Sequence, residues 1–155
     1  MMKRPFTLLI LFSLIMLSSS VSVYAQETNK PFFTVEGEVL KPFKITLNDL
    51  LRWKQAEIKA KDKEGKEHTF KGVRLFDILD SAGVTLGKEL RGKNLTKYIL
   101  IKAADGYEAI FSLPEVDPEF TSDIIVLAYQ VDGKPLPKGD GPFRIVAPSD
   151  KKQAR

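Results

Sequence analysis

Apolar and polar residues alternate along the first half of the chain in a pattern that predicts strands. Residues 32–39 are a candidate strand that ends at Lys41-Pro42, because proline cannot donate a hydrogen bond to a sheet ladder. Residues 56–61 alternate apolar with charged side chains, as a half-exposed strand does. Residues 67–71 return after a glycine-bearing turn, and we expect Gly72 to end this second arm. The first half therefore predicts a strand followed by a hairpin.

Two short helices are predicted from apolar residues at helical spacing. Thr46 is an N-cap residue type, and Asp49 lies three residues further on, which is the spacing of a capping box. The second helix has an apolar stripe at positions i, i+3, i+4 and i+7, formed by Leu75, Ile78, Leu79 and Ala82. Gly83 follows this stripe and suits the left-handed residue that ends many helices.

The second half contains three apolar runs separated by turn signals. Residues 98–101 and 124–129 are continuously apolar, which favours strands buried on both faces, and residues 143–147 predict the last strand. Asp105-Gly106 and Asp132-Gly133 are turn sequences. With about seven strands and two or three helices that do not alternate as βαβα, the pattern predicts an α+β fold with a mixed or antiparallel β-rich sheet.

The first 25 residues have the composition of a signal peptide. Lys3 and Arg4 precede an apolar run at 7–17, and Val23-Tyr24-Ala25 is a small-residue cleavage site. The run is shorter than the ~20 residues of a transmembrane helix, so we expect export to the periplasm or secretion, with no membrane span after cleavage. The expected organisation has three parts: a signal peptide at 1–25, a flexible tail at 26–31 and a single domain at 32–155.

Charge and cysteine content narrow the class of protein. The formal net charge is +4, and cleavage after Ala25 would remove two basic and no acidic residues, leaving +2. Basic residues do not interleave with aromatic ones in a stripe, which excludes nucleic acid as an expected partner. The chain has no cysteine, so the exported domain must be stabilised by core packing rather than by disulfides.

Several segments together resemble a known family, although none of them is specific alone. In chain order they are TLNDLL (46–51), FKGVRLFDILDSAGV (70–84), ADGY (104–107), LAYQVDGKPLP (127–137) and GPFRIVAP (141–148). Their order and spacing resemble the oxidoreductase molybdopterin-binding domain family, and the resemblance extends from Phe33 to Arg155. It implies the sulfite-oxidase-type fold and makes a molybdopterin cofactor possible.

The chain departs from this family in two places. Catalytic members carry a molybdenum-ligating cysteine near the strand that corresponds to Glu57–Asp62, where this chain has Ala60, Lys61 and Asp62. Neither a methyl group nor an ammonium group can replace a soft thiolate ligand. Family members usually continue after the GPFRIVAP segment into a Lys/Arg-Trp pair and a further strand, where this chain reads SDKKQAR. The resemblance therefore predicts the fold while removing its molybdenum ligand, and we expect no cofactor.

Arg144 is the main candidate binding residue. It lies between Phe143 and Ile145 in an apolar strand, so its head group either reaches solvent or binds a ligand in a pocket. The resemblance to the family's arginine favours the ligand-side role, and guanidinium is a planar anion binder. Lys151 and Arg155 add positive charge nearby, or belong to a solvated tail.

The Asp105-Gly106-Tyr107 turn is a further candidate for binding, because turns at strand ends can present ligand contacts. A plain structural turn explains the same residues. His68 is the single histidine and has too few neighbouring ligand types for zinc, so we expect a solvated histidine and no metal site. Asp117 and Glu119 are expected in an exposed turn. No residue is assigned a catalytic role.

Three functions are compatible with these observations. The first is a non-redox binding module for a small anionic ligand or a periplasmic partner protein. The second is a molybdopterin-dependent oxidoreductase, or a subunit of one, that carries a pterin cofactor without thiolate ligation. The third is an interaction domain without a pocket. The signal peptide and the missing cysteine favour the first.

Overall fold

The computed structural model describes residues 30–151 of the chain. The predicted signal peptide at 1–25, most of the predicted tail at 26–31, and Arg155 lie outside the described residues. No helix within residues 30–151 has the length and apolar character of a membrane-spanning segment.

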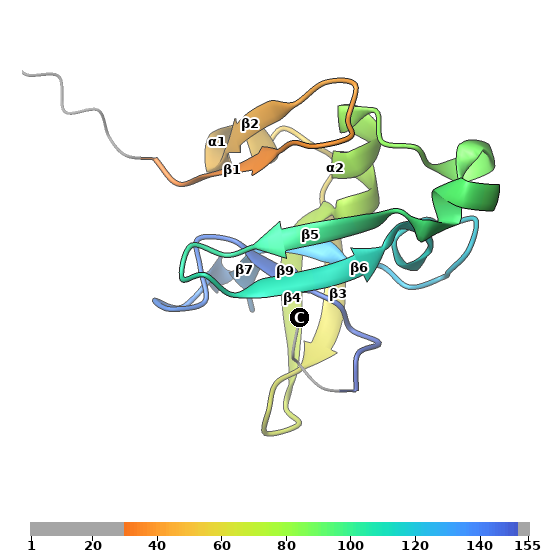
Figure 1. The fold of residues 1–155 in the computed structure, drawn as a ribbon. Coiled ribbons are helices and arrows are strands. Elements are labelled where there is room, and N and C mark those ends of the chain that lie inside the picture. Colours follow the sequence, from red (N-terminus) through yellow and green to blue (C-terminus); the bar gives the residue numbers. More distant parts are fainter. Residues whose placement is uncertain (1–29, 152–155) are drawn as a thin grey trace, which may run out of the picture.

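The largest sheet has five antiparallel strands, which we call the main sheet (Figure 1). Its strands are β3 (Ala56–Lys61), β4 (Glu67–Arg74), β7 (Val126–Val131), β8 (Lys134–Pro135) and β9 (Arg144–Val146). The order is β3-β4-β7, and both β8 and β9 pair with the far side of β7. Among the described residues, β3 pairs with β4 alone and therefore forms one edge of the sheet.

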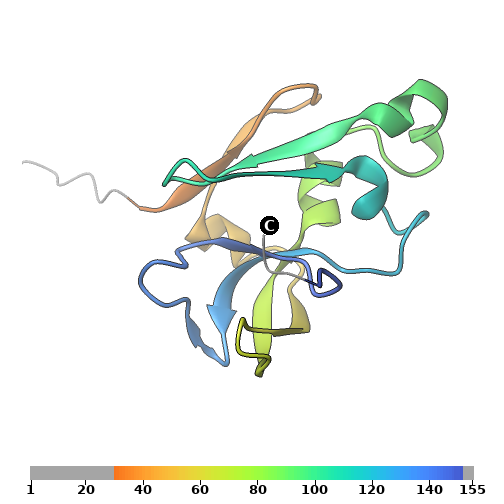
Figure 2. The same cartoon turned by 60° about the horizontal axis from the view of Figure 1, so that its bottom comes forward.

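Two smaller antiparallel hairpins lie on one side of the main sheet, together with the longer helix (Figure 2). They are β1 (Phe32–Val35) with β2 (Phe43–Thr46), and β5 (Tyr98–Lys102) with β6 (Glu108–Ser112). The helices are α1 (Leu47–Leu50), α2 (Leu75–Ala82) and the 3-10 turns η1 (Gly87–Glu89), η2 (Gly92–Thr96) and η3 (Leu113–Glu115). Within residues 30–151 the ladders between the named strands are antiparallel, which confirms the predicted β-rich α+β class.

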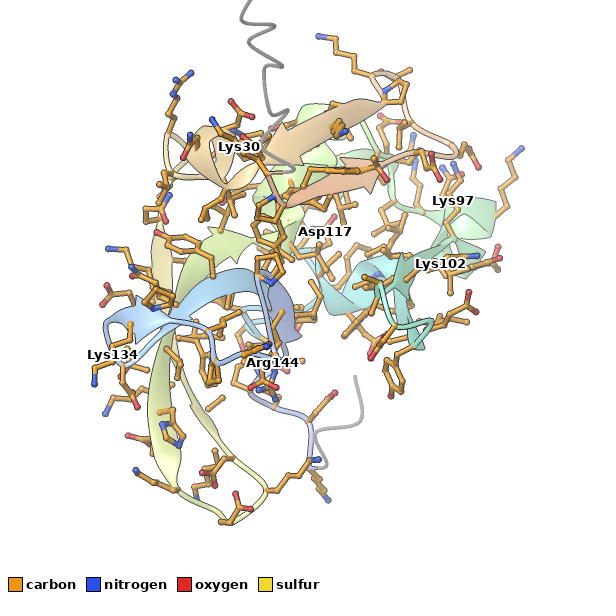
Figure 3. The ribbon with its side chains drawn as sticks, turned by 90° about the vertical axis from the view of Figure 1, so that its left-hand side faces the viewer. Lys30, Lys97, Lys102, Asp117, Lys134 and Arg144 are labelled. Atoms are coloured by element: carbon orange, nitrogen blue, oxygen red, sulfur yellow. The ribbon has the colours of Figure 1, made fainter. Side chains whose placement is uncertain are left out.

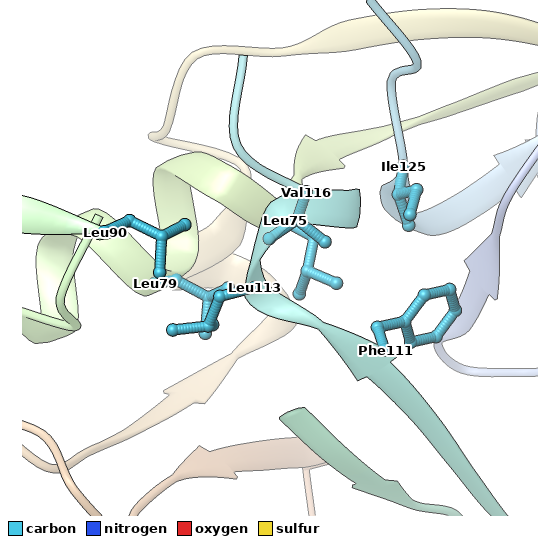
Figure 4. Packing of buried hydrophobic residues seen from close by; sticks show 7 residues of the cluster. All are labelled: Leu75, Leu79, Leu90, Phe111, Leu113, Val116 and Ile125. Atoms are coloured by element: carbon cyan, nitrogen blue, oxygen red, sulfur yellow. The ribbon is translucent and has the colours of Figure 1, made fainter. Parts of the chain in front are cut away.

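The core is built on both faces of β7. Leu127 and Tyr129 pack toward α1 and the β1–β2 hairpin, whereas Val126 and Ala128 pack with Phe70 on the opposite face. This explains the continuous apolar run, because a strand covered on both faces needs no polar side. A further cluster joins α2 to the β5–β6 hairpin (Figure 4), and it contains Leu75, Leu79, Leu90, Phe111, Leu113, Val116 and Ile125.

The helix ends follow the local sequence. The Thr46 hydroxyl accepts a hydrogen bond from the Asp49 backbone N–H, and the Asp49 carboxylate accepts one from the Thr46 N–H, so the capping box is present. Gly83 ends α2 with a φ of 72°, in the left-handed region. Both caps were predicted because each depends on residues within one turn of the chain.

Gly72 does not end its strand as expected. β4 continues to Arg74, and its register against β7 shifts between Lys71 and Gly72. A Cβ atom at Gly72 would lie 2.7 Å from Cα of Ala128, and closer still to the carbonyl oxygen of Leu127. The glycine is therefore required by the close approach of two backbones at a bulge.

Two other predicted strands differ from the structure. The first strand ends at Val35 rather than at residue 39, because Gly37 turns the chain with a φ of 103°. Residues 98–101 are not buried on both faces: Tyr98 is 63% exposed and Leu100 is 39% exposed. The β5–β6 sheet has only two strands and packs one face on the core, so alternate side chains of β5 point to solvent.

Candidate functional site

A groove of about 750 Å³ lies between the end of β3 and the chain that follows β9. We call it the β3–β9 groove. One wall is residues 59–63 with Glu67, the other is residues 144–151, and Phe70 contributes to the lining from β4. The fold thus brings together two segments more than eighty positions apart in the sequence. One of them is the segment in which the family resemblance expects the cysteine.

The alternation of β9 directs Arg144 toward this groove. Ile145 packs into the clusters next to α1 and α2, whereas Val146 packs with Ala60 and Phe70 on the other face. Arg144, two residues from Val146, shares that second face. Its guanidinium carbon lies 5.7 Å from the centre of the Phe70 ring. The groove therefore has an apolar floor with an arginine at its side.

Arg144 is anchored within the protein. One of its guanidinium nitrogens donates to a carboxylate oxygen of Asp140 at 3.1 Å, and its side chain is 31% exposed. Figure 3 shows Arg144 on the same side of the molecule as the projecting β3–β4 hairpin and away from Lys97. Because the pair with Asp140 is partly exposed, it orients the guanidinium but contributes little to stability.

Basic side chains outnumber acidic ones around the groove. The basic residues are Lys59, Lys61, Lys63, Arg144 and Lys151, and the acidic residues are Asp62, Glu67 and Asp150. The Lys59 ammonium donates to Glu67 at 2.8 Å, and this hydrogen bond raises the pKa of Lys59 and lowers the pKa of Glu67. Lys61, Lys63 and Lys151 are exposed and form no ion pair with the described residues. The groove therefore favours an anion.

His68 holds the β3–β4 turn against the β7–β8 turn. Its Nδ1 lies 2.6 Å from Asp132 and its Nε2 lies 3.0 Å from Asp62, a residue of the groove wall. These two hydrogen bonds raise the pKa of His68, with the larger effect from Asp132, and the histidine in turn lowers the pKa of both carboxyls. The expectation of a solvated histidine is wrong, because the side chain is 17% exposed and doubly bonded.

The structure places the predicted binding residues in different regions. Arg144 and Lys151 both line the β3–β9 groove. The Asp105-Gly106-Tyr107 turn joins β5 to β6, is exposed and does not line the groove. Its conformation has a structural cause, because Gly106 has a φ of 89° and the Asp105 carboxylate accepts from the Tyr107 N–H at 3.0 Å. Arg155 lies outside the described residues.

Sequence reasoning missed the contribution of the β3 lysines. The alternation of residues 56–61 predicts Lys59 and Lys61 on the solvent side of a strand, and it assigns no role to Lys63. They join Arg144 only because the main sheet brings both of its margins to one groove. The available signal was the basic alternation in the segment where the family has its cysteine.

Asp117 is not in an exposed turn as expected. Its side chain is fully buried, and its carboxylate accepts hydrogen bonds from the backbone N–H groups of Gly87 at 2.5 Å and Glu119 at 2.9 Å. It therefore fixes the start of η1 to the loop after η3. This is a structural role at a distance from the groove.

The residues present do not suit a molybdenum centre held in the family's way. The whole chain has no cysteine, and the β3 segment presents lysine, alanine and aspartate. Within residues 30–151, no group of three histidine, cysteine or acidic side chains is placed to hold a metal ion. What the groove does suit is an anionic group, since basic residues outnumber acidic ones in its lining.

Comparisons with known proteins agree with this fold. The sequence model of a family described as oxidoreductase molybdopterin binding domain matches residues 21–150. The crystal structure of the sulfane dehydrogenase SoxCD from Paracoccus pantotrophus is similar, with a TM-score of 0.57 and 22% sequence identity. The similarity covers 75% of this chain and 33% of the SoxCD chain, so this chain spans about a third of that protein chain. Comparison with curated protein sequences gives no match.

Proposed function

The chain belongs to the oxidoreductase molybdopterin-binding domain family, and from this premise we propose that it is a non-redox member that binds a small anionic ligand. The proposed site is the β3–β9 groove. The observation that carries the proposal is that five of the residues lining this groove are basic and three are acidic, in a chain that has no thiolate for molybdenum.

The groove residues suggest how an anion would be recognised. The Arg144 guanidinium presents a planar fork that matches carboxylate or phosphate oxygens. Lys61, Lys63 and Lys151 would add a positive field without fixed geometry, because lysine acts as a point charge. Arg144 would therefore supply the orientation of the ligand, and the lysines would supply attraction that weakens as the salt concentration rises.

This chain lacks the residue that would hold the metal of the cofactor that the family implies. A molybdopterin would supply oxidation and reduction at its metal, and this chain has no cysteine to hold that metal. No step of the proposed function passes through it.

Titration with inorganic pyrophosphate tests the proposal. We expect saturable binding to wild type, and a loss of about tenfold in affinity, or ~1.4 kcal/mol, in Arg144→Lys, because an ammonium does not reproduce the fork. Arg91→Lys is the matched control, since Arg91 is exposed and outside the groove. Equal affinities for wild type, Arg144→Lys and Arg144→Ala would place the site elsewhere.

The proposal includes export from the cytoplasm. Its support is the Lys3 and Arg4 pair, the apolar run that follows and the small residues before Gln26. We expect intact mass spectrometry of the protein from its native host to give a chain that begins at Gln26. A mature protein that still carries residues 1–25 contradicts this part of the proposal.

The family match also favours a second candidate function. A pterin cofactor carried without thiolate ligation would place its phosphate among the same basic side chains. Release of a pterin from the natively purified protein by acid would favour this candidate over a binding module.

A further inference from the structure

The edge of β3 exposes backbone hydrogen-bonding groups beside the groove. The Asp62 N–H donates to the Lys66 carbonyl at 2.8 Å, so residues 62 and 66 form a hydrogen-bonded pair. In an antiparallel ladder such pairs alternate with non-bonded ones. In the register of β3 and β4, the backbone groups of Lys59 and Lys61 therefore point away from β4.

These outward groups have no strand partner among the described residues. β3 pairs with β4 alone, and the chain after β9 passes beside β3 without pairing with it (Figure 1). The two segments instead form the opposite walls of the groove. An edge of this kind is a template for an added strand.

We propose that the β3 edge binds an extended acidic segment of a partner protein as an additional strand. The inference rests on the proposed anion binding by the same groove and names the form in which the anionic groups are presented. Main-chain hydrogen bonds to Lys59 and Lys61 would supply affinity, and side-chain contacts would supply specificity.

The side chains around the edge define the sequence that fits. Lys61 and Lys63 carry positive charge beside the edge, whereas Ala60, Phe70 and Val146 form an apolar floor. A paired strand directs alternate side chains to opposite faces. The matching segment alternates acidic and small apolar residues over about six positions, the usual length of a strand.

The same charges argue against a second copy of this chain as the occupant. Two β3 edges pairing with each other would bring the Lys59 and Lys61 side chains of both copies together. Lysine on an edge strand is a common defence against such self-pairing. The β3 edge therefore disfavours pairing with the β3 edge of a second copy and favours pairing with a strand of opposite charge.

The test uses a hexapeptide of alternating glutamate and valine, labelled for fluorescence anisotropy, with the full mature chain. One set of alternate backbone nitrogens in the bound peptide faces β3, and the other set faces away from it. We expect N-methylation of one set to weaken binding on the order of tenfold and N-methylation of the other set to leave it unchanged. A lysine-valine hexapeptide should not bind.

Two variants test the protein side of the same contact. Lys61→Gln removes the charge and keeps the N–H, whereas Lys61→Pro also removes the outward N–H, which β4 does not use. We expect Lys61→Pro to bind the peptide more weakly than Lys61→Gln does. The N-methylated peptides need no variant, so they decide the question even if Lys61→Pro fails to fold.

Equal binding of both N-methylated peptides overturns the inference, and so does the absence of peptide binding. A wild-type protein that is a dimer, and that the Lys61→Pro substitution converts to a monomer, also overturns it. Pyrophosphate titration of the same samples separates the two proposals. If pyrophosphate binds in an Arg144-dependent way while the peptide result is negative, the proposed function stands and the strand inference falls. If neither probe binds, both fall.

Discussion

His68 links two turns through both of its ring nitrogens, and this makes its protonation part of the stability of the fold. A neutral imidazole can donate from one nitrogen only, whereas the charged form donates to both carboxylates. Asp62 and Asp132 face the ring from the two turns, and Lys66 acts on Asp132 from the β3–β4 turn. The charged ring is the form that satisfies this arrangement.

We therefore expect the melting temperature to fall as the pH rises through the pKa of His68. That pKa is raised in the folded state above its ordinary value of 6.5, so the contribution is complete below 6.5 and is lost above the raised pKa. The pKa values of Asp62 and Asp132 are lowered from 3.8, so their contribution is present above 3.8 and disappears as the pH falls through the lowered values. Stability from this cluster is greatest between these limits.

Thermal unfolding of wild type and His68→Gln from about pH 5 to pH 9 checks this expectation. The difference between the two proteins should shrink as the pH rises. Glu64→Gln, on the same turn and exposed, is the control for a change of side chain without loss of the bridge. Parallel pH profiles for wild type and His68→Gln would contradict the role given to His68.

Residues whose conformation depends on near neighbours could be predicted from the sequence, and those with distant partners could not. The Thr46–Asp49 cap and the left-handed Gly83 belong to the first kind. His68 and Asp117 belong to the second, because their bonds reach residues 64 and 30 positions away. Nothing in the sequence around a histidine or aspartate indicates which distant turn will come within hydrogen-bond distance.

At the scale of elements, the close pairing of β4 with β7 depends on Gly72. Gly72→Ala would force a methyl group into the Leu127–Ala128 backbone, which cannot move as a flexible side chain can. We expect a loss of about 3 kcal/mol in the free energy of unfolding, as for overpacking in a core. Urea unfolding followed by circular dichroism measures it.

Gly65→Ala is the matched control for this change. Gly65 has a φ of 84°, and a Cβ there meets no atom within 4 Å, so only backbone strain of about 1 kcal/mol is expected. Similar losses for the two variants would show that the close approach at Gly72 is not what limits the substitution.

Periodicity predicted whether most segments are helices or strands, but it did not predict which of their faces are buried. The stripe of α2 and residues 125–129 of the second apolar run are buried as predicted, whereas Ile124 at the start of that run is 41% exposed and precedes β7. The equally continuous run of β5 is exposed on one face, because the β5–β6 hairpin is packed from one side only. An apolar run predicts a strand, but the layers that cover the strand are a property of the assembled fold.

In the whole molecule, strands from the two opposite sides of the main sheet, β3 and β9, line the same groove. Val146 of β9 and Ala60 of β3 belong to one buried cluster, although their strands lie at opposite sides of the sheet. The sequence predicted Arg144 and Lys151 as binding residues, and they share the groove. The β3 lysines were not predicted, because their contribution depends on this arrangement of the sheet.

We propose that a fold of the molybdopterin-binding family functions here without a molybdenum centre. The most direct test is the molybdenum content of the protein purified from its native host, grown with added molybdate. A cysteine-containing member of the family purified from the same cells is the control for cofactor supply. We predict molybdenum far below stoichiometric amounts, because the chain has no thiolate ligand. About one molybdenum per chain, the content of a dedicated single-metal site, would contradict this proposal.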